Sequence, residues 1–243
     1  AEVFSELLAR GIEVVPVTGR NYTSVPAEIR TIQGLHYLIC SNGAVVWDQI
    51  GQKPLRLALI PCGRAAALLR RLKEYRVYAC AYVDGRPYNW ASVPDFLHHY
   101  YKSLAFFRQN EHEDLPAFLE EAGWDVEKLY IVTEDEEARQ QLRSDLAEAE
   151  GVRLTSSSSW NLEINDPAAT KGAGLDFLCR YLGISPQEAA AAGDNENDIT
   201  MLRYAGLTLA PADAEREILG MVSHVVPPAA ENGVLQYAKN NFI

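Results

Sequence analysis

The chain has 243 residues, a formal net charge of -11 and an isoelectric point near 4.9. Excess acidic side chains repel the phosphate backbone of nucleic acids, so we expect no nucleic-acid partner and only small phosphate ligands. No apolar run reaches the roughly 18 residues that span a bilayer, and no signal-peptide pattern opens the chain. The sequence therefore predicts a cytoplasmic protein without a membrane partner.

The composition is that of an ordinary globular protein, with 48% apolar and 23% charged residues. The length is large for one compact domain and small for two, which favours a core with a sizeable insertion. The four cysteines are scattered among apolar neighbours without the close spacing of zinc or redox motifs, so we expect reduced thiols in the core.

The first segments read as a helix, a strand and a second strand that ends in a turn. Apolar residues at helical spacing predict a helix over residues 1–10, and Gly11 ends it. A continuous apolar run predicts a strand over 12–17 that is covered on both faces, with Pro16 near its end. Residues 36–41 form a further expected strand, followed by a tight turn at 42–43 that leads into 44–47.

The middle of the chain has a different pattern. We expect a helix over 61–75, a strand over 77–83, a strand over 128–133, a helix over 135–149 and two short strands between 152 and 164. Alternating side chains in 77–83 indicate an open sheet with one polar face, backed by helices. The sequence thus predicts a separate inserted domain over residues 48–162.

Buried strands and helices alternate again in the last part of the chain. The expected helices are 171–182, 197–204 and 212–220, and the expected strands are 189–192, 207–209 and 224–226. This alternation is typical of a parallel sheet with crossover helices. The predicted architecture is therefore one α/β core, formed by residues 1–47 and 163–243, that an insertion divides.

Two polar positions at element ends are candidates for phosphate binding. Thr18-Gly19-Arg20 follows a predicted strand, and ligands of open α/β sheets bind at the carboxyl ends of strands. Lys171 opens a predicted helix, where the helix dipole disfavours a cation unless an anion is held beside it. The alternatives are a helix cap for the threonine and a solvated side chain for the lysine.

An acidic run follows the expected strand 189–192. It places Asp194 and Asp198, with the amides of Asn195 and Asn197, next to a glycine that allows a sharp turn. Carboxylate and amide oxygens are the ligands that Mg²⁺ prefers, so the run predicts magnesium-dependent phosphate chemistry. The alternative is a solvated acidic turn before a helix.

Together these motifs resemble one known family. Thr18-Gly19-Arg20, Ser41-Asn42-Gly43-Ala44, Lys171 and the run 193–198 have the order and spacing of the haloacid dehalogenase superfamily, and in particular of its Cof-like phosphatases. The resemblance covers the whole chain. It implies an α/β fold with a Rossmann-like parallel-sheet core and an inserted α+β cap domain.

The resemblance also implies a role for each motif in a two-step phosphoryl transfer through an aspartyl-phosphate. Thr18 donates to the phosphoryl group, Lys171 holds nucleophile and phosphate together, and Asp194 binds Mg²⁺. Asn197 contacts phosphoryl oxygens, and Asp198 orients Lys171 or a metal-bound water. The implied phosphate-binding set is Thr18, Gly19, Arg20, Asn42, Lys171 and Asn197.

One part of the family pattern is absent from the sequence. An Asp-x-Asp pair on the first strand supplies the nucleophile and the general acid and base, and the helix at 1–10 follows that strand in the family. Asp84-Gly85 lacks the partner aspartate, and a hairpin turn explains it better. We therefore expect that the sequence is truncated and that it is nearly inert, because a lost nucleophile costs on the order of 10⁶ in kcat.

Two functions remain open from the sequence. The first is a magnesium-dependent phosphatase of small phosphorylated metabolites such as sugar phosphates, in which cap aromatics such as Tyr82, Tyr88, Trp90 and Tyr130 contact the substrate or form the core. The second is a catalytically silent protein that binds a phosphate ligand. A Rossmann-type nucleotide-binding module is disfavoured, because the Gly-x-Gly-x-x-Gly loop is missing.

Overall fold

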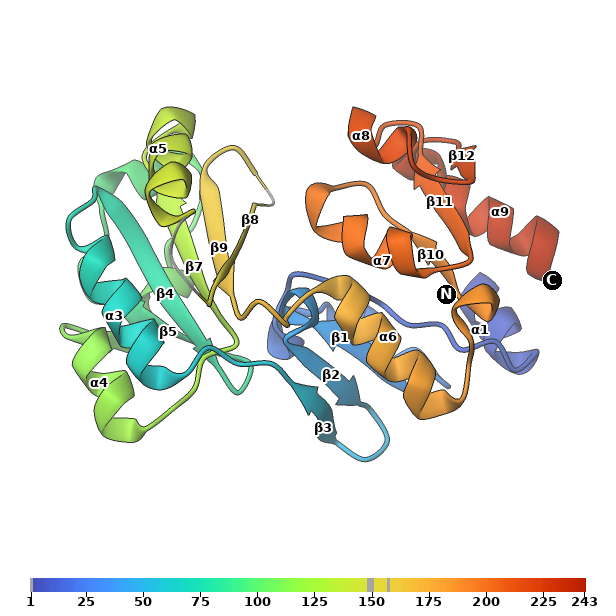
Figure 1. The fold of residues 1–243 in the computed structure, drawn as a ribbon, viewed down its shortest axis with the longest axis horizontal. Helices are drawn as coiled ribbons and strands as arrows, with labels where there is room; N and C mark the ends of the chain where they lie inside the picture. The colour runs from blue at the N-terminus through green and yellow to red at the C-terminus, as the bar shows by residue number, and fades with distance from the viewer. Residues whose placement is uncertain (1, 148–150, 157) are drawn as a thin grey trace. The chain divides into compact units, whose positions relative to one another are not determined.

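The computed structural model describes residues 2–147, 151–156 and 158–243. The chain divides into two compact units (Figure 1): unit 1 comprises Ala1–Leu57 and Ala168–Ile243, and unit 2 comprises Ala58–Pro167. The chain thus passes from one unit to the other twice. The assignment of residues 1–47 with 163–243 as a catalytic core, and of 48–162 as a cap, stays a prediction.

The first segment of unit 1 forms a small antiparallel sheet with the order β1-β2-β3. The predicted first helix is confirmed over the described residues, and Ala1 lies outside them. The predicted turn at 42–43 is also confirmed, because a short 3-10 turn joins β1 to β2. The elements are α1 (Glu2–Ala9), a 3-10 turn (Tyr22–Ser24), α2 (Ala27–Arg30), β1 (Tyr37–Cys40), a 3-10 turn (Ser41–Gly43), β2 (Val45–Asp48) and β3 (Lys53–Leu57).

The strand predicted over 12–17 is wrong. Among the described residues, this segment makes one parallel bridge, between Val17 and Ile39, through bonds from the Thr18 amide to the Ile39 carbonyl (2.8 Å) and from the Ile39 amide to the Pro16 carbonyl (3.0 Å). The next bond of a parallel ladder would need an N–H group on Pro16, which proline lacks. Pro16 therefore stops the ladder after one bridge.

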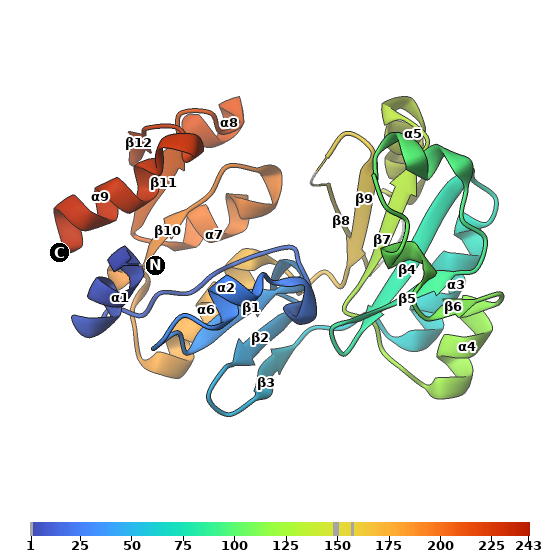
Figure 2. The same ribbon diagram turned by 180° about the vertical axis from the view of Figure 1, so that it is seen from behind.

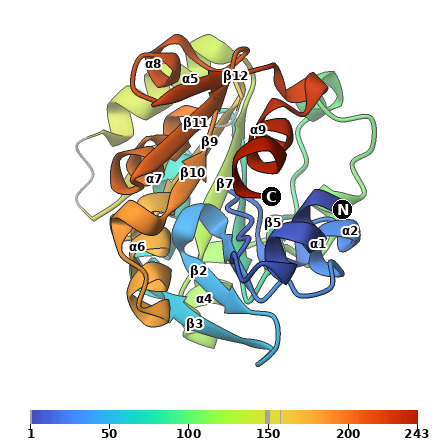
Figure 3. The same cartoon turned by 90° about the vertical axis from the view of Figure 1, so that its right-hand side faces the viewer.

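The second segment of unit 1 contains a parallel sheet with the order β10-β11-β12. Helices α7 and α9 lie on opposite faces of this sheet (Figure 3), and α6 packs on β1 and β2 (Figure 1). The elements are α6 (Lys171–Leu182), a 3-10 turn (Pro186–Glu188), β10 (Ala190–Ala192), a 3-10 turn (Glu196–Asp198), α7 (Ile199–Tyr204), β11 (Leu207–Pro211), α8 (Arg216–Leu219), β12 (His224–Val226), a 3-10 turn (Ala229–Glu231) and α9 (Gly233–Phe242).

Each sheet of unit 1 packs against an apolar cluster of described residues. The first cluster surrounds Ile39 and Leu178, and the second surrounds Ala191 and Ala210. Val17 packs against both clusters. The segment that ends at Thr18 therefore lies where the two sheets of unit 1 meet.

Unit 2 is built on one six-stranded sheet with the order β6-β5-β4-β7-β9-β8 (Figure 2). Its pairs are antiparallel except for β5 with β6. Residues 148 and 149 of the predicted helix 135–149 lie outside the described residues. The elements are α3 (Cys62–Leu72), β4 (Val77–Val83), β5 (Arg86–Trp90), 3-10 turns (Asp95–His99 and Phe106–Arg108), β6 (Glu111–His112), α4 (Leu115–Ala122), β7 (Lys128–Thr133), α5 (Glu136–Leu146), β8 (Arg153–Thr155) and β9 (Asn161–Asn165).

The sheet of unit 2 has no polar face at β4, contrary to the prediction, because all seven residues of β4 are buried. Ala79 and Ala81 point into the cluster beneath the helices. Tyr78 and Tyr82 point to the other face, where Phe107 belongs to an aromatic cluster from the turns between β5 and β6. The aromatic residues between β5 and β6 are visible in the sequence, but their packing against β4 is not.

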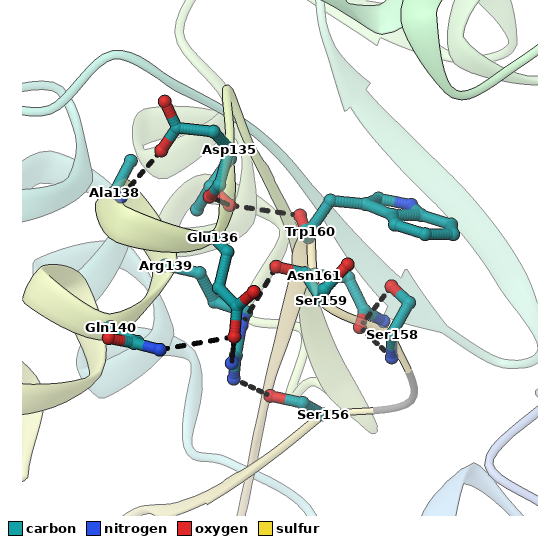
Figure 4. Close-up of polar contacts among 11 residues, drawn as sticks. Asp135, Glu136, Ala138, Arg139, Gln140, Ser156, Ser158, Ser159, Trp160 and Asn161 are labelled. Carbon is teal, nitrogen blue, oxygen red and sulfur yellow. Dashed lines mark hydrogen bonds and ion pairs between the residues drawn. The ribbon is translucent and has the colours of Figure 1, made fainter.

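The loop between β8 and β9 is held by side chains of α5 and of the loop itself (Figure 4). Arg139 donates from Nε to the Ser159 carbonyl (3.0 Å) and from Nη1 to the Ser156 hydroxyl (3.2 Å). The Ser158 hydroxyl donates to Asn161 Oδ1 (2.9 Å). These bonds of Ser156, Ser158 and Ser159 therefore stabilise this end of the sheet of unit 2.

The four cysteines are free thiols. Three of them are buried, as predicted, whereas Cys62 is half-buried at the first residue of α3. Among the described residues, no helix is both long and apolar enough to cross a membrane.

Candidate active site

Lys171 is the centre of a hydrogen-bonded network in unit 1. It is the first residue of α6, and its side chain is only 8% exposed. Its ammonium group donates to Asn197 Oδ1 (2.9 Å) and to Asp198 Oδ1 (2.6 Å). An ammonium group has three donors, and the described residues accept two of them. One N–H of Lys171 thus remains for a ligand.

Asp198 connects this lysine to the loop after β10. Its Oδ2 accepts hydrogen bonds from the amides of Asp194 (3.0 Å) and Asn195 (3.2 Å), while its Oδ1 accepts from Lys171. A Cβ at Gly193 would lie 2.4 Å from the Cβ of Asp198, so only glycine lets the loop fold this closely around the carboxylate. The buried carboxylate of Asp198 is therefore fully engaged in holding Lys171 and the loop.

Asn197 extends the network to the first half of unit 1. Its Nδ2 donates to Asn42 Oδ1 (3.3 Å), and the Asn42 amide donates to the Thr18 carbonyl (3.1 Å). Asn42 adopts a left-handed conformation (φ 58°), which asparagine tolerates better than most residues. The Thr18 hydroxyl accepts from the Arg20 amide (3.1 Å). One series of hydrogen bonds thus joins Thr18 to the loop of Asp194.

Close backbone packing fixes the start of α6 against its neighbours. Thr170 caps the helix by accepting from the Ala173 amide (3.0 Å). A Cβ at Gly43, where φ is 96°, would lie 2.0 Å from the Thr170 carbonyl oxygen. The Gly172 amide donates to the Thr200 hydroxyl (3.0 Å). These contacts position Lys171 at the junction of three loops.

The acidic loop carries closely spaced carboxylates. Burial raises the pKa of Glu215, and the neighbouring carboxylates of Glu196 and Asp194 raise it further. Asp194 is exposed, and no described residue contacts its carboxylate. Mutual repulsion between carboxylates fits a bound cation. The described residues contain no group of three or more metal-ligating side chains, so on its own this loop offers one free carboxylate ligand.

The structure brings most of the predicted site residues together. Asn42, Lys171, Asn197 and Asp198 meet through their side chains, whereas Asp194 and Thr18 join the network through backbone groups. Gly19 and Arg20 follow Thr18 directly, and the side chain of Arg20 is exposed. The roles of these residues in binding and catalysis stay predictions.

The sequence analysis missed the residues that hold the site in place. Thr170 is a helix cap directly before Lys171, which the cap pattern could have indicated. Gly43 and Gly172 are needed because other backbone segments approach them closely. Such long-range contacts have no local signal in a single sequence.

Fold and site together define an α/β protein with a buried lysine network in unit 1 and a second unit inserted between the two stretches of unit 1. A profile of the haloacid dehalogenase-like hydrolases matches residues 1–237. The chain therefore belongs to the haloacid dehalogenase-like hydrolases. This confirms the predicted family and the predicted fold class.

Relatives and solved structures match nearly the whole chain. The 5-amino-6-(5-phospho-D-ribitylamino)uracil phosphatase YcsE of Bacillus subtilis is 25% identical over 93% of this chain and 80% of its own length. The pyridoxal phosphate phosphatase YbhA of Escherichia coli is 24% identical over 98% of this chain and 90% of its own length. The solved structure of a haloacid dehalogenase-like hydrolase from B. subtilis is 25% identical, with a TM-score of 0.80, and the match covers 99% of this chain and 91% of that one.

Proposed function

We propose that this protein is a magnesium-dependent phosphatase of small phosphorylated metabolites, such as sugar phosphates, that acts through an aspartyl-phosphate. The main support is the environment of Lys171, a buried cation whose ammonium group has one N–H left for a ligand oxygen. Burial strengthens the attraction between this charge and a phosphoryl group. Phosphoryl transfer depends mainly on such positioning and charge neutralisation.

Each side chain of the network has a place in this reaction. A carboxylate oxygen attacks phosphorus, the bond to the substrate oxygen breaks, and that oxygen takes up a proton. Water then attacks phosphorus, and the bond to the carboxylate breaks to release phosphate. Lys171, Thr18 and Asn197 donate to the phosphoryl oxygens, with Gly19, Arg20 and Asn42 beside them, and Asp198 holds Lys171 in place.

Asp194 is the proposed ligand of Mg²⁺. Mg²⁺ is commonly held by one or two carboxylates together with water and substrate phosphate, and Asp194 is an exposed residue whose carboxylate has no partner among the described residues. When bound, the ion neutralises charge on the phosphoryl group. The repulsion that Glu215 experiences from Glu196 and Asp194 supports a cation at this loop.

The nucleophile is proposed to come from a strand outside residues 1–243. Asp198 is unsuited to this role, because both of its oxygens accept hydrogen bonds within the network. Among the described residues, β10 pairs only with β11, and Val17 pairs only with Ile39. Both sheets of unit 1 therefore have an open edge near the site, which supports a further strand that carries the Asp-x-Asp pair.

The test is phosphatase activity towards a generic phosphomonoester in the presence and absence of Mg²⁺. It compares residues 1–243 with a chain that carries an upstream Asp-x-Asp strand. We expect turnover in the extended chain alone, and we expect Asp194→Ala to abolish its magnesium-dependent activity by removing a metal ligand. Unchanged magnesium dependence in that variant would contradict the assignment of Asp194.

A second candidate is a silent protein that binds a phosphate ligand without turnover. The engagement of both Asp198 oxygens favours it for residues 1–243, since no described carboxylate that bonds to Lys171 is left to attack phosphorus. Absence of turnover in both chains, together with retained phosphate binding, would support this candidate over the phosphatase.

The substrate is proposed to be small and recognised by unit 2. The two relatives named above are phosphatases of a ribitylaminouracil phosphate and of pyridoxal phosphate, which are both small phosphorylated metabolites. In unit 2, Lys128 lies over the rings of Tyr82 (5.2 Å) and Tyr130 (5.6 Å) and pairs with Glu163 (3.2 Å). We propose that unit 2 acts as the cap that selects the substrate.

A further inference from the structure

Arg56 lies on β3, one residue before the chain first leaves unit 1. It is paired in register with Val46 of β2, so the two side chains share a face of the sheet. Val46 belongs to the apolar cluster that contains Leu178 of α6. The side chain of Arg56 is thus on the face of the sheet that α6 covers.

The guanidinium group of Arg56 joins two distant carbonyl groups. Nη1 donates to the Gly43 carbonyl (2.6 Å), and Nη2 donates to the Ala168 carbonyl (2.7 Å). Ala168 is the residue at which the chain re-enters unit 1. Both bonds are short and charge-assisted, and the planar fork of arginine suits two acceptors at once.

Both carbonyls belong to segments that hold the phosphate network. Gly43 follows Asn42, whose side chain accepts from Asn197. Ala168 precedes Thr170, which caps α6 directly before Lys171. Gly43 also packs directly on the Thr170 carbonyl, as the 2.0 Å approach of a Cβ there indicates.

We propose that Arg56 is a positioning residue that couples the two crossings between the units to the Asn42–Asn197–Lys171 network. A displacement of the first crossing moves Arg56 and thus pulls on both carbonyls, whereas a displacement of the second crossing moves the Ala168 carbonyl and the rigid guanidinium transmits it to Gly43. Asn42 and Lys171 are then positioned together or not at all. The importance of Arg56 for catalysis rests on the proposed function, whereas the coupling between the two segments does not.

Hydrogen exchange of the full chain, measured by mass spectrometry, tests the coupling. The reporters are the amides of Asn42, Ala44 and Thr170, which donate to carbonyls within the two segments or to Thr18. In Arg56→Ala we expect exchange to rise about tenfold or more in both 41–44 and 168–171, because each segment loses a charge-assisted bond. A rise in only one segment, or none, would overturn the proposal.

Arg71→Ala is the matched control. Arg71 also donates from a terminal nitrogen to a distant backbone carbonyl, that of Asp145 (2.7 Å), but within unit 2. We expect no change in 41–44 or 168–171 in this variant. An equal rise there would mean that the loss of any such arginine loosens the chain, and would defeat the coupling.

Arg56→Lys addresses the possibility that the alanine variant fails to fold. Lysine keeps the charge and the aliphatic stem but replaces the planar fork by a single nitrogen. We expect faster exchange in both segments at an unchanged melting temperature. Exchange equal to that of the parent chain would overturn the proposal that the planar guanidinium is needed to hold both carbonyl groups.

The exchange result and the phosphatase result are independent. Faster exchange in both segments, combined with no turnover in the chain that carries the upstream strand, would retain the coupling and reject the proposed function. Turnover in that chain, combined with unchanged exchange in Arg56→Ala, would retain the proposed function and reject the coupling.

Discussion

Lys171 and Asp198 form a buried ion pair, and replacing only one of the two residues is expected to destabilise the fold. Their side chains are 8% and 5% exposed and 2.6 Å apart. A buried ion pair adds little net stability relative to apolar residues, but removal of one partner leaves an uncompensated charge. The same pair that holds the proposed phosphate site is therefore also a determinant of stability.

Lys171→Met is expected to lower the free energy of unfolding by about 3 kcal/mol, because the buried carboxylate of Asp198 loses its counter-charge. Urea unfolding at neutral pH measures this. The double variant Lys171→Met with Asp198→Asn is expected to recover about 1 kcal/mol or more, since no charge is then left unpaired. A single-variant loss below about 0.5 kcal/mol would mean that the pair is effectively solvated.

Glu215 gives the acidic loop a pH dependence with a defined sign. Its pKa is raised by burial and then by Glu196 and Asp194, so the folded chain holds this proton at pH values where the unfolded chain has lost it. Folded stability therefore falls as pH rises from the ordinary pKa through the raised one. We expect Glu215→Gln to raise the melting temperature at about pH 7 but not at about pH 4. An equal rise in melting temperature at both pH values would show that the raised pKa of Glu215 is not its cause.

At the scale of elements, the start of α6 depends on how closely the 41–43 turn approaches it. The virtual Cβ of Gly43 is 2.0 Å from the Thr170 carbonyl, whereas a Cβ at Gly183 would meet nothing within 4 Å. Both glycines have positive φ angles, of 96° and 71°. The pair therefore separates the cost of backbone conformation from the cost of a steric clash.

Gly183→Ala is expected to destabilise the chain by about 1 kcal/mol, the cost of a left-handed alanine. Gly43→Ala is expected to cost at least about 2 kcal/mol more, because the turn must move away from α6. Chemical denaturation of the two variants measures the difference. Equal losses would show that the turn can move without cost, which contradicts its role in positioning Lys171.

The sequence predicted elements well where one local pattern was sufficient. The strand 77–83, the strand 128–133 and the helix 171–182 match β4, β7 and α6 at both ends. The prediction of a strand over 12–17 was wrong because it gave the apolar run more weight than the missing N–H group of Pro16, which ends the ladder. Helix α9 and the edge strand β3 were not predicted.

The site was predictable only as a set of separate motifs. Family resemblance pointed to Lys171, Asn197 and Asp198, and the structure joins them through hydrogen bonds. The roles of Arg56 and Gly43 could not be predicted from the sequence. Both residues contact backbone carbonyl groups, which every residue possesses.

At the scale of the whole molecule, the two units have separate apolar cores. Unit 2 is one continuous stretch, and its sheet is packed by clusters from its own residues. Unit 1 is formed by two stretches of chain that flank this insertion. This organisation is typical of domains that can fold alone.

Residues 58–167 expressed alone are therefore expected to fold, with a cooperative thermal transition followed by circular dichroism. The described strands of their sheet and the apolar clusters on its two faces all consist of residues of unit 2. A fragment with dispersed amide resonances would agree with this expectation. A fragment that is unfolded would show that unit 2 depends on unit 1 for its stability.

The most direct measurement is a titration of the full chain with inorganic phosphate, followed by amide chemical shifts. Phosphate bound at the Lys171 network should perturb the amides of Gly19, Asn42 and Asn197 together, and Lys171→Met should abolish all three changes. No saturable change at these amides at millimolar phosphate, or changes that survive in Lys171→Met, would contradict a phosphate site at this network.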